Sequence, residues 1–103
     1  MGNLSRVVAD LEPLARRAGY NPDTLAALCR VSLRQLERVL RKTRGKTPTQ
    51  FCRELQCDDA KPHLASGLQT RAVAEKLKFA SPQYFCRVFK KIQGGSPQEF
   101  ASG

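Results

Sequence analysis

The chain has 103 residues, of which 41% are hydrophobic and 26% charged, a composition typical of one small globular domain. Lys and Arg number 18 against 9 Asp and Glu, and the net charge of +9 favours a polyanionic partner such as nucleic acid. No apolar run approaches the roughly 20 residues that span a bilayer, and the N-terminus lacks a signal-peptide core. We therefore expect a cytoplasmic protein without a membrane partner.

The first elements predicted along the chain are two helices. Apolar residues at helical spacing from Leu4 to Ala15 indicate an amphipathic helix that ends near Gly19. Asn21 has the features of an N-cap, because a proline and an acidic residue follow it directly. We expect a short second helix from this cap to about Cys29.

A third and a fourth helix are predicted from their caps. Ser32 and Gln35 have the spacing of a capping box, and Gly45 is suited to the left-handed end of the third helix. Thr47 opens the fourth helix in the same way, and Gly67 suits its end. The fourth helix is therefore expected over residues 48–66.

Pro62 falls inside this fourth helix. It lacks a backbone N–H, and its ring clashes with the carbonyl four residues earlier, at a cost of about 3 kcal/mol in a regular helix. We expect the helix to bend at Pro62 or to be split there into two segments.

The remaining elements are again helices. A short helix is predicted from Thr70 to Leu77, a longer one over residues 81–93, and a brief final one opened by Ser96. No segment alternates with a period of two residues, so the sequence predicts an all-α fold of about seven helices.

The chain contains an internal repeat. Residues 32–42 (SLRQLERVLRK) recur 49 positions later as residues 81–91 (SPQYFCRVFKK). The register continues through four further pairs, which are Gly45 and Gly94, Thr47 and Ser96, Pro48 and Pro97, and Phe51 and Phe100. Each copy follows a short helix and a turn, so the repeat predicts two helix-turn-helix units.

The turns of the two units differ by one residue in length. Their alignment places Cys29 opposite Leu77 and Arg30 opposite Lys78. Cys29 is therefore predicted to lie in the core. Arg30 and Lys78 would be mildly strained if the backbone there is left-handed.

The second helix of each unit has an apolar face and a polar, basic face at about 100° per residue. The apolar side chains are Leu33, Leu36, Val39 and Leu40 in the first copy and Phe85, Val88, Phe89 and Ile92 in the second. The opposite faces carry Arg34, Arg38 and Arg41 in the first copy and Gln83, Arg87 and Lys90 in the second. Such a helix fits the major groove, where Arg can pair with guanine and Gln with adenine.

Over residues 4–101 the chain resembles the DNA-binding domain of the AraC/XylS family of bacterial transcription regulators. The most specific part of the resemblance is V73-A-E-K-L-x-F-x-S-x-x-Y-F-x-R-V-F-K-K91, followed by Gly94, Ser96, Pro97 and Phe100. The resemblance implies homeodomain-like three-helical units over residues 4–46 and 69–101, joined by a linker helix over residues 48–66. It also implies that the second helices of the two units enter successive major grooves.

The resemblance also implies roles for particular side chains. The residues expected to read bases are Arg34, Glu37, Arg38, Gln83, Tyr84 and Arg87. The resemblance and the positive charge together indicate a second set of residues, suited to phosphate contacts. These are Ser32, Arg41, Lys42, Lys46, Thr47, Ser81, Lys90, Lys91 and Ser96. Glu37 has an alternative role, because it could instead form an i,i+4 ion pair with Arg41.

Other chemistry is poorly supported by the sequence. The four cysteines lack C-x-x-C spacing and His63 is the single histidine, so neither a zinc site nor another cofactor is expected. The cysteines are expected to be free thiols. No phosphate-cradling glycine loop or catalytic constellation is present, so we expect no enzyme activity.

The sequence thus predicts a double-stranded DNA-binding domain of a bacterial transcription regulator. A monomer is expected for this chain, and a dimer is possible in a longer parent protein. The alternative is a degenerate module whose basic surface binds an acidic protein such as an RNA polymerase subunit. Arg30, Lys78 and Pro62 depart from the family pattern and leave room for that alternative. General coating of nucleic acid is disfavoured, because only Tyr84 is placed to stack on bases.

Overall fold

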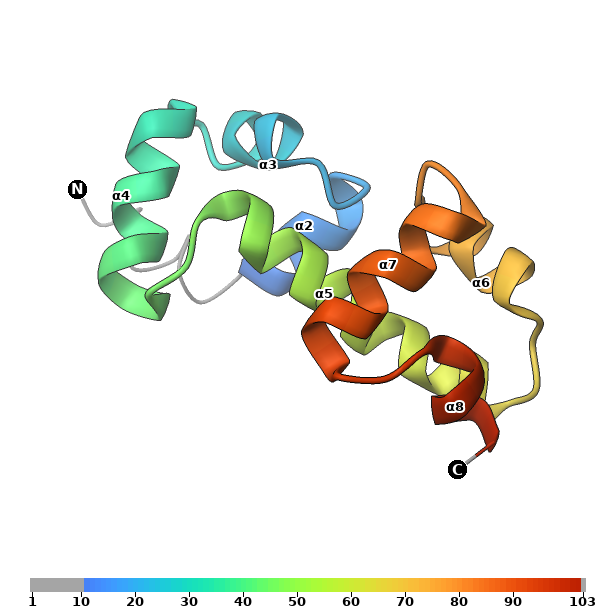
Figure 1. Cartoon of the computed structure of the whole chain (residues 1–103). Helices are drawn as coiled ribbons and strands as arrows, with labels where there is room; N and C mark the ends of the chain where they lie inside the picture. The colour runs from blue at the N-terminus through green and yellow to red at the C-terminus, as the bar shows by residue number, and fades with distance from the viewer. Residues whose placement is uncertain (1–10, 103) are drawn as a thin grey trace. The chain divides into compact units, whose positions relative to one another are not determined.

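The computed structural model describes residues 11–102, and its regular structure in that range is entirely helical (Figure 1). The helices are α2 (Leu11–Arg17), α3 (Pro22–Leu28), α4 (Leu33–Arg44), α5 (Pro48–Ala65), α6 (Thr70–Lys76), α7 (Pro82–Gln93) and α8 (Pro97–Ser102). The all-α prediction is confirmed. The part of the expected first helix that begins at Leu4 lies outside the described residues. The chain divides into two compact units, and the boundary lies within α5, between Cys52 and Arg53.

The helices of the first unit begin at the predicted caps. The Asn21 side chain accepts a hydrogen bond from the Thr24 amide at 3.1 Å. Ser32 and Gln35 form the reciprocal capping box, with side chain to backbone distances of 3.1 and 2.9 Å. Gly45 ends α4 with φ 67°. These local bonds satisfy amides that a helix end would otherwise leave unpaired.

The core of the first unit comes from one face of each helix. Its fully or nearly fully buried side chains are Leu11 and Ala15 on α2, Leu25 and Ala26 on α3, and Leu36 and Leu40 on α4. α3 packs against both α2 and α4. The predicted apolar face of α4 is therefore centred on Leu36 and Leu40, while Leu33 and Val39 at its edges are half-buried. Burial of this face fixes which side of α4 is left for solvent.

The second unit is built from the later part of α5 together with α6, α7 and α8. Its core includes Ala60 and Leu64 on α5, Val73 and Ala74 on α6, and Phe85 and Phe89 on α7. A row of aromatic rings runs from the turn before α7 to α8, with centroid separations of 4.7 Å for Phe79–Phe85, 5.7 Å for Phe85–Phe89 and 5.8 Å for Phe89–Phe100. These tilted and edge-on rings pack α7 against its neighbours.

The two helix-turn-helix corners have the same backbone geometry. Arg30 and Lys78 are left-handed, with φ of 59° and 67°, so the condition under which these two residues would be strained is met. Each donates its amide to the carbonyl three residues earlier, at 3.1 Å in both units. Cys29, just before the first corner, is 8% exposed and belongs to the core as predicted. The extra residue of the second unit is accommodated after its corner, before the cap of α7.

Pro62 does not divide α5, and the prediction of two segments is wrong. The helix is continuous over its 18 residues. Pro62 lies in its last turn, where the loss of one amide affects only the bond to Asp58. Beyond it the Ser66 amide still donates to the Pro62 carbonyl at 3.0 Å. A bend at this position stays a prediction.

Candidate nucleic-acid interface

The outward face of α4 consists of exposed polar and charged side chains. Arg34, Arg38 and Arg41 are exposed, whereas Leu36 and Leu40 on the opposite face are fully buried. The faces predicted for this helix are therefore confirmed. The arginines project from a helix that is capped at both ends and packed along one side, so they can present guanidinium groups from a fixed backbone.

α7 repeats this arrangement in the second unit. Its cap is Ser81, whose hydroxyl accepts a hydrogen bond from the Tyr84 amide at 3.1 Å. Gln83 and Arg87 are exposed on the helix that follows. Tyr84 is 39% exposed, and its ring centroid lies 6.1 Å from that of Phe79. Tyr84 is thus supported on one side by the turn and open to solvent on the other.

The side chains predicted to contact phosphate fall into two groups. The exposed cations are Arg41, Lys42, Lys90 and Lys91, all in the last turns of α4 and α7. Thr47 and Ser96, also in the predicted set, stand at the starts of α5 and α8, where their backbone amides are already engaged in hydrogen bonds. Thr47 donates its amide to Gln50 at 3.1 Å, and Ser96 donates its amide to Glu99 at 3.4 Å. A phosphate at either amide would have to replace a side chain.

An ion pair anchors the end of α4. Arg44 donates to both carboxylate oxygens of Glu12 on α2, at 2.8 and 3.3 Å. The hydrogen bond from Arg44 lowers the pKa of Glu12, and the same bond raises the pKa of Arg44. The guanidinium carbon also lies 5.5 Å from the centre of the Phe51 ring. No local sequence pattern indicates this contact, because Glu12 and Arg44 are 32 residues apart in the chain.

A buried glutamine on α5 contacts the corner before α7. Gln56 is fully buried, and its amide nitrogen donates to the Leu77 carbonyl at 2.8 Å. This residue was not predicted from the sequence. The available signal was a polar residue between Leu55 and Cys57, which are both buried apolar residues of the same helix.

Comparison with known proteins decides the family. Residues 25–103 match a family model described as a helix-turn-helix domain. The chain belongs to the AraC-type helix-turn-helix family. It is also 30% identical, over 91 residues, to the uncharacterized HTH-type transcriptional regulator YtdP of Bacillus subtilis (strain 168). That match covers 87% of this chain and 10% of the relative, so the chain spans a tenth of the relative's length. No solved structure matches the chain.

Two charged positions of the AraC-type domain bear on the predicted base readers. Within the part of the chain that the structure describes, Glu37 and Arg41 form no ion pair, although they are one helical turn apart. The Glu37 carboxylate is exposed beside Arg34 and Arg38 on α4. It is therefore available to accept a hydrogen bond from a partner.

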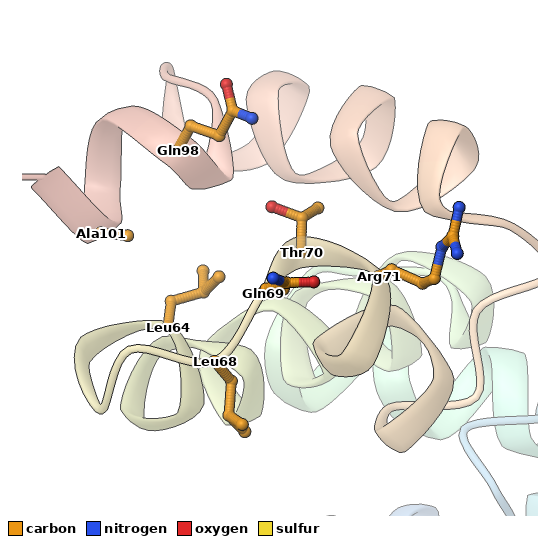
Figure 2. Close-up of a pocket in the computed structure, with 7 residues that line it drawn as sticks. All are labelled: Leu64, Leu68, Gln69, Thr70, Arg71, Gln98 and Ala101. Carbon is orange, nitrogen blue, oxygen red and sulfur yellow. The ribbon is translucent and has the colours of Figure 1, made fainter.

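A hollow of about 610 Å³ lies within the second unit of this AraC-type domain (Figure 2). Its walls are Leu64, Leu68, Gln69, Thr70, Arg71, Gln98 and Ala101. None of the predicted base-reading or phosphate-contacting residues lines it, and Arg71 is its single ionisable side chain. The hollow therefore lacks a pair of groups for acid–base catalysis. Regulators of this family are in general not enzymes.

The cysteines of the AraC-type domain are free thiols. Burial raises the pKa of Cys29, and burial together with the neighbouring charge of Asp58 raises the pKa of Cys57 to about 12. Among residues 11–102, no three His, Cys, Asp or Glu side chains gather as a metal site requires. In the same range, no helix is both long and apolar enough to cross a membrane.

Proposed function

We propose that this AraC-type domain binds double-stranded DNA sequence-specifically, as part of a bacterial transcription regulator. The observation that carries the proposal is the duplicated geometry of α4 and α7. Each helix follows a left-handed corner, begins at a serine cap, buries one face and exposes arginine on the other. A solvated surface has no reason to recur with the same cap and the same arginine six residues later.

In the proposed mechanism, α4 and α7 enter successive major grooves. Arg38 and Arg87 occupy equivalent positions in the repeat and would each pair with guanine O6 and N7. Gln83 would pair with adenine, and Glu37 would accept from a cytosine amine. Arg34 and Tyr84 would complete the contacts of their helices. The guanidinium of an exposed arginine on a packed helix is well suited to this forked geometry.

Phosphate contacts would supply most of the affinity. The cations in the last turns of α4 and α7 lie at the ends of the proposed reading helices, where the DNA backbone would pass. The net charge of +9 supports a strongly salt-dependent interaction, because neutralised phosphates release condensed counterions.

The proposed function also has consequences for location, partners and oligomeric state. We expect a cytoplasmic DNA-bound regulator, with RNA polymerase as a further partner and the domain bound to its site as a monomer. The internal repeat already provides two reading helices, so a second copy of the chain is not required for two contacts.

Selection of the purified chain against a random duplex pool, at about 150 mM salt, tests the proposal. We expect enrichment of two short elements about 10 base pairs apart. Enrichment of a single element would mean that one unit reads bases and the other contacts only the DNA backbone. Tight binding at low salt without any enrichment would overturn sequence-specific recognition, and it would favour the module that binds an acidic protein.

A further inference from the structure

Gln56 is the polar side chain that the second unit buries completely. Its exposed fraction is 0%, and it is the single buried polar or charged residue in the part of the chain that the structure describes. Burying an amide is unfavourable unless its donor and acceptor are both paired. The contacts of Gln56 therefore indicate why a glutamine occupies this position.

Both ends of the Gln56 amide are paired. Its oxygen accepts a hydrogen bond from Nη1 of Arg53, one turn earlier on α5. Its nitrogen donates to the carbonyl of Leu77 at 2.8 Å. Leu77 is the C-cap of α6, where a helix leaves carbonyls without intrahelical partners. The side chain thus links α5 to the end of the first helix in the helix-turn-helix unit.

The segment held by this bond includes a strained corner. Lys78 directly follows Leu77 and has φ 67°, a left-handed backbone that a lysine adopts at a cost in free energy. An external hydrogen bond to the Leu77 carbonyl favours this conformation, because it fixes the direction of the peptide group that enters the corner. The bond therefore offsets part of the strain at Lys78.

The corner is connected in turn to α7. Phe79, the next residue, is 8% exposed, and its ring centroid lies 4.7 Å from that of Phe85 on α7. A shift of the corner would move Phe79, and Phe79 cannot move without disturbing its packing with Phe85. A continuous series of contacts, through Leu77 and Phe79, thus connects Gln56 to the helix that carries Gln83 and Arg87.

We propose that Gln56 is a positioning residue for the second recognition helix. Its buried amide holds the corner at Leu77–Phe79 and so sets the orientation in which α7 meets the bases. This inference rests on the proposed DNA-binding function. It goes beyond that function by assigning a role in specificity to a side chain that does not touch DNA.

The test compares Gln56→Leu with Gln69→Leu. The control removes a glutamine of the same unit that is exposed and makes no side-chain capping bond. Hydrogen exchange of the Lys78 and Phe79 amides reports on the corner itself. Gln56→Leu removes both hydrogen bonds, but only the one to Leu77 holds the corner. We therefore expect this exchange to accelerate about tenfold, the size expected from loss of that one buried hydrogen bond. The control should exchange like the wild type.

The second measurement is discrimination between matched and mismatched duplexes from the selection. Gln56→Leu should lose about tenfold in discrimination at base pairs assigned to α7 and nothing at those assigned to α4. A purely structural role would lower stability but leave this ratio unchanged in the folded protein. Unchanged discrimination at both elements, in a variant whose corner exchanges faster, would overturn the positioning role alone.

Two further variants keep the test decisive. If Gln56→Leu does not fold, Gln56→Glu retains the size of the side chain and an acceptor for Arg53, but its ionised carboxylate cannot donate to Leu77. The same loss of discrimination is expected. A second substitution, Lys78→Gly, removes the backbone strain at the corner. Added to either variant, it should restore part of the lost discrimination. No recovery would contradict the proposed mechanism. If the wild type itself selects no sequence, the proposed function fails and the positioning role fails with it.

Discussion

At the scale of single residues, two nearby cations on α7 are expected to contact different parts of DNA, one a base and the other a phosphate. Arg87 and Lys91 are both exposed and stand one helical turn apart. Arg87 matches Arg38 in the repeat and carries the forked guanidinium that we propose pairs with guanine, whereas Lys91 lies in the last turn with a single ammonium group. The two residues carry the same charge, so a role in general attraction to phosphate would make them equivalent. Replacing each in turn therefore distinguishes base recognition from phosphate contact.

Arg87→Ala should weaken binding to the selected duplex by about 1–3 kcal/mol and relax specificity at one position. Lys91→Ala should weaken binding to selected and random duplexes alike and reduce the salt slope by about one. Titrations of both duplexes at several salt concentrations measure these effects. Equal losses on the two duplexes for Arg87→Ala would reduce Arg87 to a phosphate contact.

The Glu12–Arg44 pair predicts a pH-dependent stability of the first unit. Because the pKa of Glu12 is lowered in the folded state, its stabilisation is present above the unfolded pKa and is lost as pH falls through the lowered folded value. The pair is about one-third exposed, so Glu12→Gln should cost only about 0.5–1 kcal/mol at pH 7. Thermal unfolding should show this difference at pH 7 and a progressive decrease as the pH is lowered into the acidic range. A difference that does not change with pH would assign the effect to packing.

The thiols should differ sharply in reactivity. Cys57 is fully buried with its pKa raised to about 12, and Cys29 is also buried with a raised pKa, so both thiols should react slowly at pH 8. Cys86 on α7 is half-buried and should be alkylated first. Mass spectrometry of the alkylated protein tests the order. The selected duplex should protect Cys86 if α7 lies in the groove, while a random duplex at the same salt should protect it less.

At the scale of elements, the caps decide where the reading helices end. Gly94 is left-handed with φ 81° at the end of α7, whereas its neighbour Gly95 has no positive φ. Gly94→Ala should therefore destabilise the domain by about 1 kcal/mol, and Gly95→Ala should be close to neutral. Denaturant unfolding measures both. Equal effects of the two substitutions would show that the backbone of Gly94 does not limit the choice of residue.

Features of the elements that depend on neighbours in sequence could be predicted from the sequence. The capping boxes at Ser32 and Thr47 join residues three positions apart, so sequence spacing is sufficient to find them. The buried faces centred on Leu36 and Phe85 followed from helical periodicity. The repeat also placed Arg30 opposite Lys78, and both residues have a left-handed backbone.

Features that depend on tertiary contacts could not be predicted in this way. Gln56 meets Leu77 at a separation of 21 residues, and Arg44 meets Glu12 at a separation of 32. No local pattern indicates which distant group a side chain will contact. For Pro62 the sequence left two alternatives open, a bend or a division of the helix. Only the division is excluded, because Pro62 lies in the last turn of a continuous helix.

At the scale of the whole molecule, two copies of one small unit could contact DNA at two places, whereas one copy could contact it at one. Under the proposed function, DNA binding by α4 raises the effective concentration of α7 at the neighbouring groove, because both helices belong to one chain. A monomer could therefore reach a specificity that a single helix-turn-helix usually gains by dimerisation. The claim that follows is that both α4 and α7 contact base edges on the same duplex.

Methylation interference on a selected duplex tests this claim most directly, because it identifies guanines whose N7 must remain free. We predict two groups of interfering guanines about 10 base pairs apart on one face of the helix. Arg38→Ala should remove the interference in one group, and Arg87→Ala should remove it in the other. Interference confined to one group, or unchanged by both substitutions, would contradict reading by two recognition helices.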